Sequence, residues 1–106
     1  MPKYLLQASY NADGAKGLLK EGGTSRKTAI EQLVKNAEGK VESIYWALGD
    51  EDAYVTVDLP NHVSAAALSM NVAASGLVRI KTTPLLTAEE VDQASRKTLN
   101  YRAPGK

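Results

Sequence analysis

Residues 41–60 read VESIYWALGDEDAYVTVDLP and decide the fold. Apolar and polar side chains alternate over residues 53–59, which is typical of a strand with one buried face. Residues 40–48 alternate more loosely, and their Tyr-Trp pair places one ring on each face. Residues 49–52 combine a glycine with three acids and supply the turn. The stretch therefore predicts a β-hairpin, which Pro60 ends.

Two more stretches have the alternation of strands. Residues 4–10 (YLLQASY) alternate throughout, and residues 77–83 alternate until Pro84, which is expected to close that strand. A first helix is predicted over residues 24–38, with its threonine or serine at the start as the cap and Gly39 as the stop. The glycine-rich connector before it is expected to contain a turn at 11–14 and at most a short helical turn at 15–21.

A second helix is predicted over residues 62–75, capped by Asn61. Its apolar residues expected to face the sheet are Val63, Ala66, Ala67, Met70 and Ala74. Thr87 and Glu90 have the spacing of a capping box and predict a third, peripheral helix. We expect one domain over residues 1–106, with a core at about 3–84, a C-terminal helix at about 87–99 and a basic tail at 100–106.

The predicted order is β-α-β-β-α-β with an added helix, which is the α+β, ferredoxin-like plan. Right-handed crossovers would then give an antiparallel sheet with both main helices on one face. The other face is expected to be polar and aromatic, and a second copy of the chain is expected to cover it in a dimeric α/β barrel. Its side chains would be Gln7, Ser9, Tyr54, Thr56, Asp58, Arg79 and Lys81, with Tyr45 or Trp46.

Composition excludes several classes of function. The 13 basic and 12 acidic side chains give a net charge of +1, which argues against nucleic acid as a partner. The absence of cysteine excludes disulfides and thiolate metal sites. No apolar run approaches the roughly 20 residues of a membrane span, so no membrane partner is expected. The first residues lead into a strand without the pattern of a signal peptide, so the cytoplasm is the expected location.

Acids and histidine give weak signals for chemistry. The acids at 50–52 lack the alternating oxygen ligands of a calcium loop, so we predict no metal and interpret them as a charged turn that keeps the hairpin in register and soluble. His62 is the only histidine and is expected to be an exposed first-turn residue. Haem ligation or action as a base remain alternatives for it. No cofactor is predicted, and no catalytic residue can be named.

Aromatic side chains around the hairpin allow two interpretations. They can pack in the core or a dimer interface, or they can form the wall of a small-molecule pocket with a few polar anchors. Arg26 lies in the first turn of the first helix, where the helix macrodipole disfavours a cation by roughly 0.3–1 kcal/mol. Such a cation either pairs with a group elsewhere or is a solvated surface charge. The candidate ligand-binding residues are Arg26, Tyr45, Trp46, Asp52, Tyr54, His62 and Arg79.

The run YWALGDEDAYVTVDLP, the alanine-rich helix and the run SGLVRIKTTPLLTAEE together resemble the GYD domain family, from residue 4 to about 91. The family is named for a Gly-Tyr-Asp element, usually with one residue between the glycine and the tyrosine. Gly49 and Asp52 match that element, but Glu51 replaces the tyrosine, and Asn61-His62 stands where the family usually shows acids. The other matching residues are Arg26, Tyr45-Trp46, Asp58-Leu59-Pro60, Gly76 and Thr82-Thr83.

The resemblance implies a small bacterial protein of the dimeric α/β-barrel, ferredoxin-like superfamily. It implies no activity, because the family is functionally uncharacterised and the fold hosts many functions. We therefore predict a homodimer or higher homo-oligomer that binds or senses a small molecule. The alternatives are a cofactor-free monooxygenase- or isomerase-like enzyme acting on a small organic substrate, and a non-catalytic assembly subunit.

Overall fold

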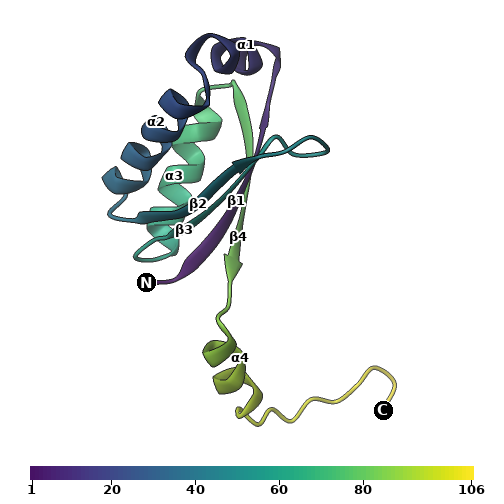
Figure 1. Cartoon of the computed structure of the whole chain (residues 1–106). Coiled ribbons are helices and arrows are strands. Elements are labelled where there is room, and N and C mark those ends of the chain that lie inside the picture. The colour runs from purple at the N-terminus through teal and green to yellow at the C-terminus, as the bar shows by residue number, and fades with distance from the viewer.

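The computed structural model describes all residues, 1–106. It contains one open, four-stranded antiparallel sheet with strand order β2-β3-β1-β4. Helices α2 and α3 both cover the same face of this sheet (Figure 1). The elements are β1 (Lys3–Tyr10), α1 (Ala12–Glu21), α2 (Gly23–Asn36), β2 (Lys40–Trp46), β3 (Ala53–Asp58), α3 (His62–Ala74), β4 (Val78–Leu85) and α4 (Ala88–Ser95). None of the helices is long and apolar enough to cross a membrane.

The core lies between the sheet and the two main helices. The side chains of β1 and β3 point alternately into the core and toward the face of the sheet without helices, the open face, as their sequences predict. Helix α2 adds Val34, which is fully buried. Each such side chain stabilises the fold by about 1.5–3 kcal/mol when it leaves water. The core cluster consists of Tyr4, Leu6, Val34, Val55, Val57, Leu59, Ala65 and Leu68.

The connector before α2 is more helical than its sequence predicts. Asn11 accepts a hydrogen bond from the backbone N–H of Gly14 and caps α1, so the expected turn at 11–14 is wrong. Gly22, at φ 84°, ends α1 and also precedes α2, which has no side-chain cap. The predicted threonine or serine cap is therefore wrong as well. Glycines within α1 lower its helix propensity by about 1 kcal/mol each, which hid this helix from a reading of the sequence.

Helix α3 begins at the predicted residue with the predicted Asn61 cap and ends one residue early, at Ala74, but it is rotated about its axis relative to the prediction. Ala65 and Leu68 face the core, whereas Val63 and Met70 are 78% and 69% exposed. The predicted contact line is therefore wrong. Small apolar residues lie on almost every side of this helix, so its sequence specifies no direction. A 2.5 Å hydrogen bond between the hydroxyls of Ser69 and Thr82 is one contact that sets its rotation against β4.

Pro84 does not close the last strand, because β4 continues to Leu85. Pro84 lies opposite Tyr4 of β1. Since β4 is an edge strand, the N–H that proline lacks need not cost a bond in the ladder. The capping box of Thr87 and Glu90 is confirmed at the start of α4. All residues of α4 are exposed, and with the tail it projects away from the sheet (Figure 1).

The end of α2 differs from its sequence-based prediction in an instructive way. Glu38, not Gly39, has the left-handed conformation, with φ 63°. The N–H groups of Glu38 and Gly39 bond to the carbonyls of Lys35 and Val34, which is the Schellman pattern. Gly39 is needed for another reason: a Cβ on it would lie 2.4 Å from the carbonyl oxygen of Asp58.

Substitutions at these neighbouring positions should therefore have opposite effects. Gly39→Ala should lower the free energy of unfolding by roughly 1–3 kcal/mol, because the added methyl overpacks the β3 backbone. Glu38→Gly should be neutral or stabilising by up to about 1 kcal/mol, because glycine adopts positive φ without strain. Urea unfolding of the two variants beside the wild type measures both effects. Equal destabilisation by the two substitutions would contradict this account of the turn.

Candidate functional site

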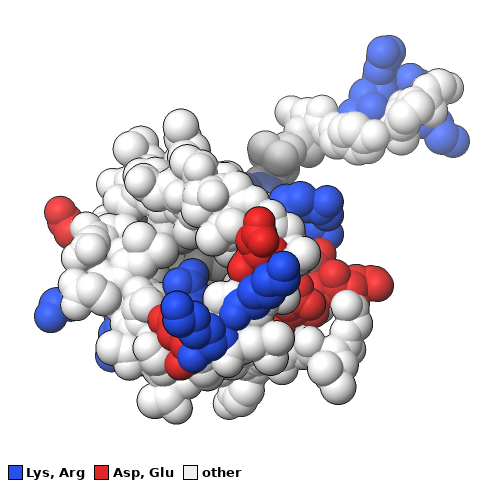
Figure 2. Space-filling view, turned by 90° about the horizontal axis from the view of Figure 1, so that it is seen from above, with Lys and Arg blue, Asp and Glu red and all other residues white.

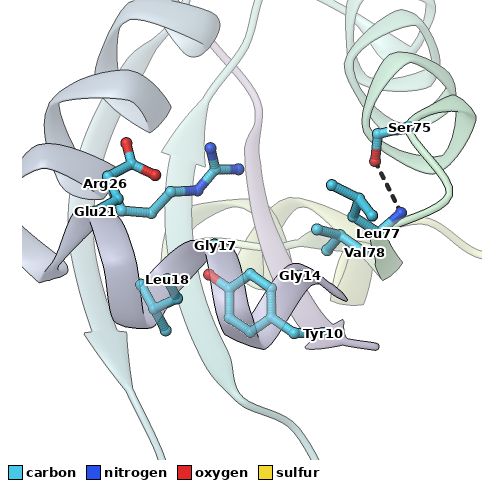
Figure 3. A pocket seen from close by; sticks show the side chains of 9 residues that line it. All are labelled: Tyr10, Gly14, Gly17, Leu18, Glu21, Arg26, Ser75, Leu77 and Val78. Carbon is cyan, nitrogen blue, oxygen red and sulfur yellow. Dashed lines mark hydrogen bonds between the residues drawn. The ribbon is translucent and has the colours of Figure 1, made fainter. Parts of the chain in front are cut away.

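A cleft opens at the end of the sheet that carries α1. It lies between α1, the start of α2 and the segment that leads into β4, and its volume is about 180 Å³. Figure 2 looks onto this end of the molecule, where basic and acidic side chains stand close together around a hollow. The lining residues are Tyr10, Gly14, Gly17, Leu18, Glu21, Arg26, Ser75, Leu77 and Val78 (Figure 3).

Arg26 dominates the electrostatics of this cleft. It lies in the first turn of α2 and extends its guanidinium group over the cleft (Figure 3). Its side chain is half-buried, and it forms no hydrogen bond or ion pair within the chain through the guanidinium. Arg26 also lines two neighbouring hollows, one of them an almost wholly apolar space of about 40 Å³ between α2, α3 and the sheet.

Tyr10 forms part of the cleft floor. It is the last residue of β1 and lies on the face of the sheet that the helices cover. Its hydroxyl oxygen accepts a 3.3 Å hydrogen bond from the indole N–H of Trp46, which leaves the hydroxyl proton without an acceptor in the chain. Trp46 therefore lies on the helix side and holds the ring of Tyr10, while Tyr45 lies on the open face opposite Tyr54.

Glu21 is the one acid of the cleft lining. One of its carboxylate oxygens accepts a 3.3 Å hydrogen bond from the hydroxyl of Ser25, one turn further along the chain. Glu21 makes no ion pair with Arg26. The cleft thus presents a guanidinium group and a free hydroxyl proton, with a carboxylate at its rim that already has a donor.

The hairpin turn and its acids lie on the side of the sheet opposite the helices. The turn bends toward the open face (Figure 1), where Glu51 is only 6% exposed. Its two oxygens pair with the ammonium group of Lys81 at 2.7 Å and the hydroxyl of Ser9 at 2.5 Å. Asp52 accepts a bond from the backbone N–H of Tyr10. Glu51 therefore departs from the predicted charged turn that keeps the hairpin soluble, because its carboxylate is buried and paired, and of the three acids only Asp50 is exposed.

Two groups of the chain have perturbed pKa values. A hydrogen bond from Lys81, and to a smaller extent one from Ser9, holds the pKa of the Glu51 carboxyl below its ordinary value of 4.5. A hydrogen bond to Glu42, and to a smaller extent one to Asp58, raises the pKa of the Lys3 ammonium above its ordinary value of 10.5. Neither group lines the cleft. No group of three or more histidine or acidic side chains is placed to hold a metal ion.

His62 is exposed at the first turn of α3, where the sequence places it. Its Nδ1 shares a 2.6 Å hydrogen bond with the hydroxyl of Tyr4, and the two rings meet edge to face. Tyr4 and Tyr10 stand at opposite ends of β1, which places His62 about 20 Å from the cleft by strand geometry. His62 therefore does not belong to the cleft.

The seven candidate residues do not form one site. Arg26 lines the cleft. Trp46 does not line it but donates a hydrogen bond to Tyr10, which does. Asp52 accepts a hydrogen bond from the backbone of β1. Tyr45, Tyr54 and Arg79 lie on the open face. The candidates named from the sequence did not include Tyr10, Gly17 or Glu21. The alternation of residues 4–10 already placed Tyr10 on the helix face, but nothing in the sequence showed that α1 would stop short of covering it.

The model of the GYD domain family matches residues 4–95 of the 106-residue chain. The chain belongs to the GYD domain family. No curated protein and no solved structure matches it significantly. The turn of this GYD domain resembles the element that gives the family its name, with Glu51 in place of the tyrosine. In this member of the family the position holds a paired carboxylate on the open face, away from the cleft.

The Glu51 pair gives this GYD domain an acid-sensitive contact. Because the pKa of Glu51 is lower in the folded state than in the unfolded state, its contribution to stability is present above 4.5 and is lost as the pH falls through the folded value. Glu51→Gln should therefore lower the thermal midpoint near neutral pH and make the loss of stability less steep as the pH falls below 4.5. Circular dichroism melts between neutral and acidic pH measure both effects. An unchanged pH dependence in Glu51→Gln would contradict the assignment.

Proposed function

We propose that this GYD domain is a homo-oligomeric small-molecule-binding module whose ligand occupies the cleft between α1, α2 and the sheet. The observation that supports the proposal is Arg26. A half-buried cation has lost part of its hydration, and a ligand group that pairs with it would offset that loss. The same side chain borders an apolar space, and ligand sites combine apolar walls with a few polar anchors.

The cleft supports binding better than catalysis. An acid–base enzyme places a group with a shifted pKa within reach of its substrate. The two shifted groups, Lys3 and Glu51, are committed to ion pairs on the open side of the sheet. The monooxygenase- or isomerase-like alternative therefore has no observation in its favour at this cleft.

Pairing of two copies through the open face is the second part of the proposal. Tyr45 is 71% exposed on this face beside Tyr54, and aromatic side chains are enriched at the centres of interfaces. The strand order β2-β3-β1-β4, with both helices on the opposite face, supports a ferredoxin-like subunit that closes a dimeric α/β barrel. The projecting arm of α4 and the tail leaves Leu86, Leu99 and Tyr101 exposed, which also favours contact with another copy.

Ligand binding is tested by a thermal-shift screen of small metabolites on wild type and Arg26→Ala. At least one compound should raise the wild-type midpoint, and the shift should be abolished in Arg26→Ala, because that variant removes the anchor and leaves the apolar walls. Lys27→Ala is the matched control, since Lys27 is a neighbouring exposed cation that does not line the cleft. Hits that Arg26→Ala leaves unchanged would contradict the placement of the ligand.

The oligomeric state is tested by light scattering. The wild type should be a dimer or larger at micromolar concentration, and Tyr54→Glu should shift it toward the monomer, because the variant buries an unpaired charge in the interface. Val63→Glu is the control, since it adds the same charge to an exposed apolar position on the outer side of α3. A monomeric wild type, or equal dissociation by both variants, would contradict the barrel.

A further inference from the structure

The guanidinium group of Arg26 is unpaired in a chain that pairs its other partly buried cation. Lys3, also half-buried, contacts Glu42 and Asp58, and the exposed Lys81 contacts Glu51. An arginine side chain stays protonated in proteins, so it cannot relieve burial by losing its proton. Its position in the first turn of α2 adds an unfavourable interaction with the helix dipole. An anion in the cleft would offset both costs.

Gly17 provides an independent indication that the cleft is kept open. It lies within α1 and lines the cleft, and a Cβ built on it would meet nothing within 4 Å. Its neighbour Gly14 is different, because a Cβ there would lie 2.4 Å from the carbonyl oxygen of Leu77. A glycine inside a helix costs about 1 kcal/mol relative to alanine, and no contact of the chain requires it at 17. Because Gly17 itself lines the cleft, a larger side chain at this position would reduce the free space at the cleft wall.

The shape and chemistry of the cleft define a class of ligand. A guanidinium group is planar and holds a carboxylate through two parallel hydrogen bonds, and the free hydroxyl proton of Tyr10 is a further donor. Beneath them, Ile30, Val72 and Ile80 border the apolar space. The cleft volume of about 180 Å³ is below the roughly 300–1,000 Å³ of pockets for drug-sized ligands, so the cleft taken alone accommodates a small ligand.

We propose that the cleft binds a small organic carboxylate, with its carboxylate on Arg26, its apolar part toward the space beneath α2, and the absent side chain of Gly17 leaving it room. This inference rests on the proposed function and specifies its ligand class. Glu21 at the rim disfavours anions in general, so its removal should strengthen binding.

The experiment uses matched pairs of probes on the full chain. Benzoate and hexanoate are compared with benzamide and hexanamide, which have the same shape without the charge, and with inorganic phosphate, in thermal-shift and calorimetric titrations. A carboxylate should bind, and its amide and phosphate should not. Arg26→Met should weaken binding about 10- to 100-fold, because it keeps the apolar stem and loses the charged hydrogen bonds.

The glycine gives a second, oppositely signed readout. Gly17→Ala should raise the thermal midpoint of the free protein and weaken carboxylate binding, and Gly17→Leu should abolish binding by filling the cleft. Gly23→Ala is the control, because Gly23 is another helical glycine with nothing near its Cβ position but does not line the cleft. It should leave affinity unchanged. Glu21→Gln should bind carboxylates more tightly than the wild type.

The outcomes separate the two proposals. If no probe, charged or neutral, and no metabolite binds, the binding function itself is overturned. If the amides bind as well as the carboxylates, or if Arg26→Met and Gly17→Leu bind carboxylates as the wild type does, the carboxylate inference is overturned while a binding module stands. Binding of phosphate in place of the carboxylates, lost in Arg26→Met, would overturn the carboxylate class and assign the cleft to a phosphate group.

Discussion

Strand β1 is hydrogen-bonded along both edges, to β3 on one side and to β4 on the other, and the rest of the molecule depends on this pairing. A strand held on both sides cannot slip by one residue without moving every side chain to the wrong face. The register therefore places Tyr4 and Leu6 in the core. The register also sets the contacts at the two ends of β1. At one end the hydroxyl of Tyr4 forms a hydrogen bond with His62, and at the other end Tyr10 forms part of the cleft floor.

The acidic turn completes this arrangement at the Tyr10 end of β1. Asp52 accepts from the backbone N–H of Tyr10, a group that would otherwise lack a partner where the ladder with β3 ends. Glu51 folds onto the open face, where the neighbouring strands supply Ser9 and Lys81. The acidic turn thus stabilises the sheet in this chain.

The cleft exists because α1 is inserted between β1 and α2 and lies against the end of the sheet. Gly14 allows the helix backbone to approach Leu77 closely, and Gly17 leaves a gap where most helices would have a side chain. The cleft lies on the helix side of the sheet, and the aromatic pair of Tyr45 and Tyr54 lies on the open side. Ligand binding and pairing of copies therefore use opposite faces of one sheet, so variants can separate them.

The sequence by itself determined the strands, their inward and outward faces, the Asn61 cap of α3 and the capping box of α4. Each follows from a local period of side chains or from a cap a few residues away, which the chain specifies without distant partners. The tertiary structure decided the rotation of α3, the passage of β4 through Pro84, the burial of Glu51 and the cleft beside Arg26. Apolar residues surround α3 on nearly every side, and an edge strand tolerates proline. The partners of Glu51 come from β1 and β4, and the cleft needs α1 and the β4 entry, so all four depend on segments that only folding brings together.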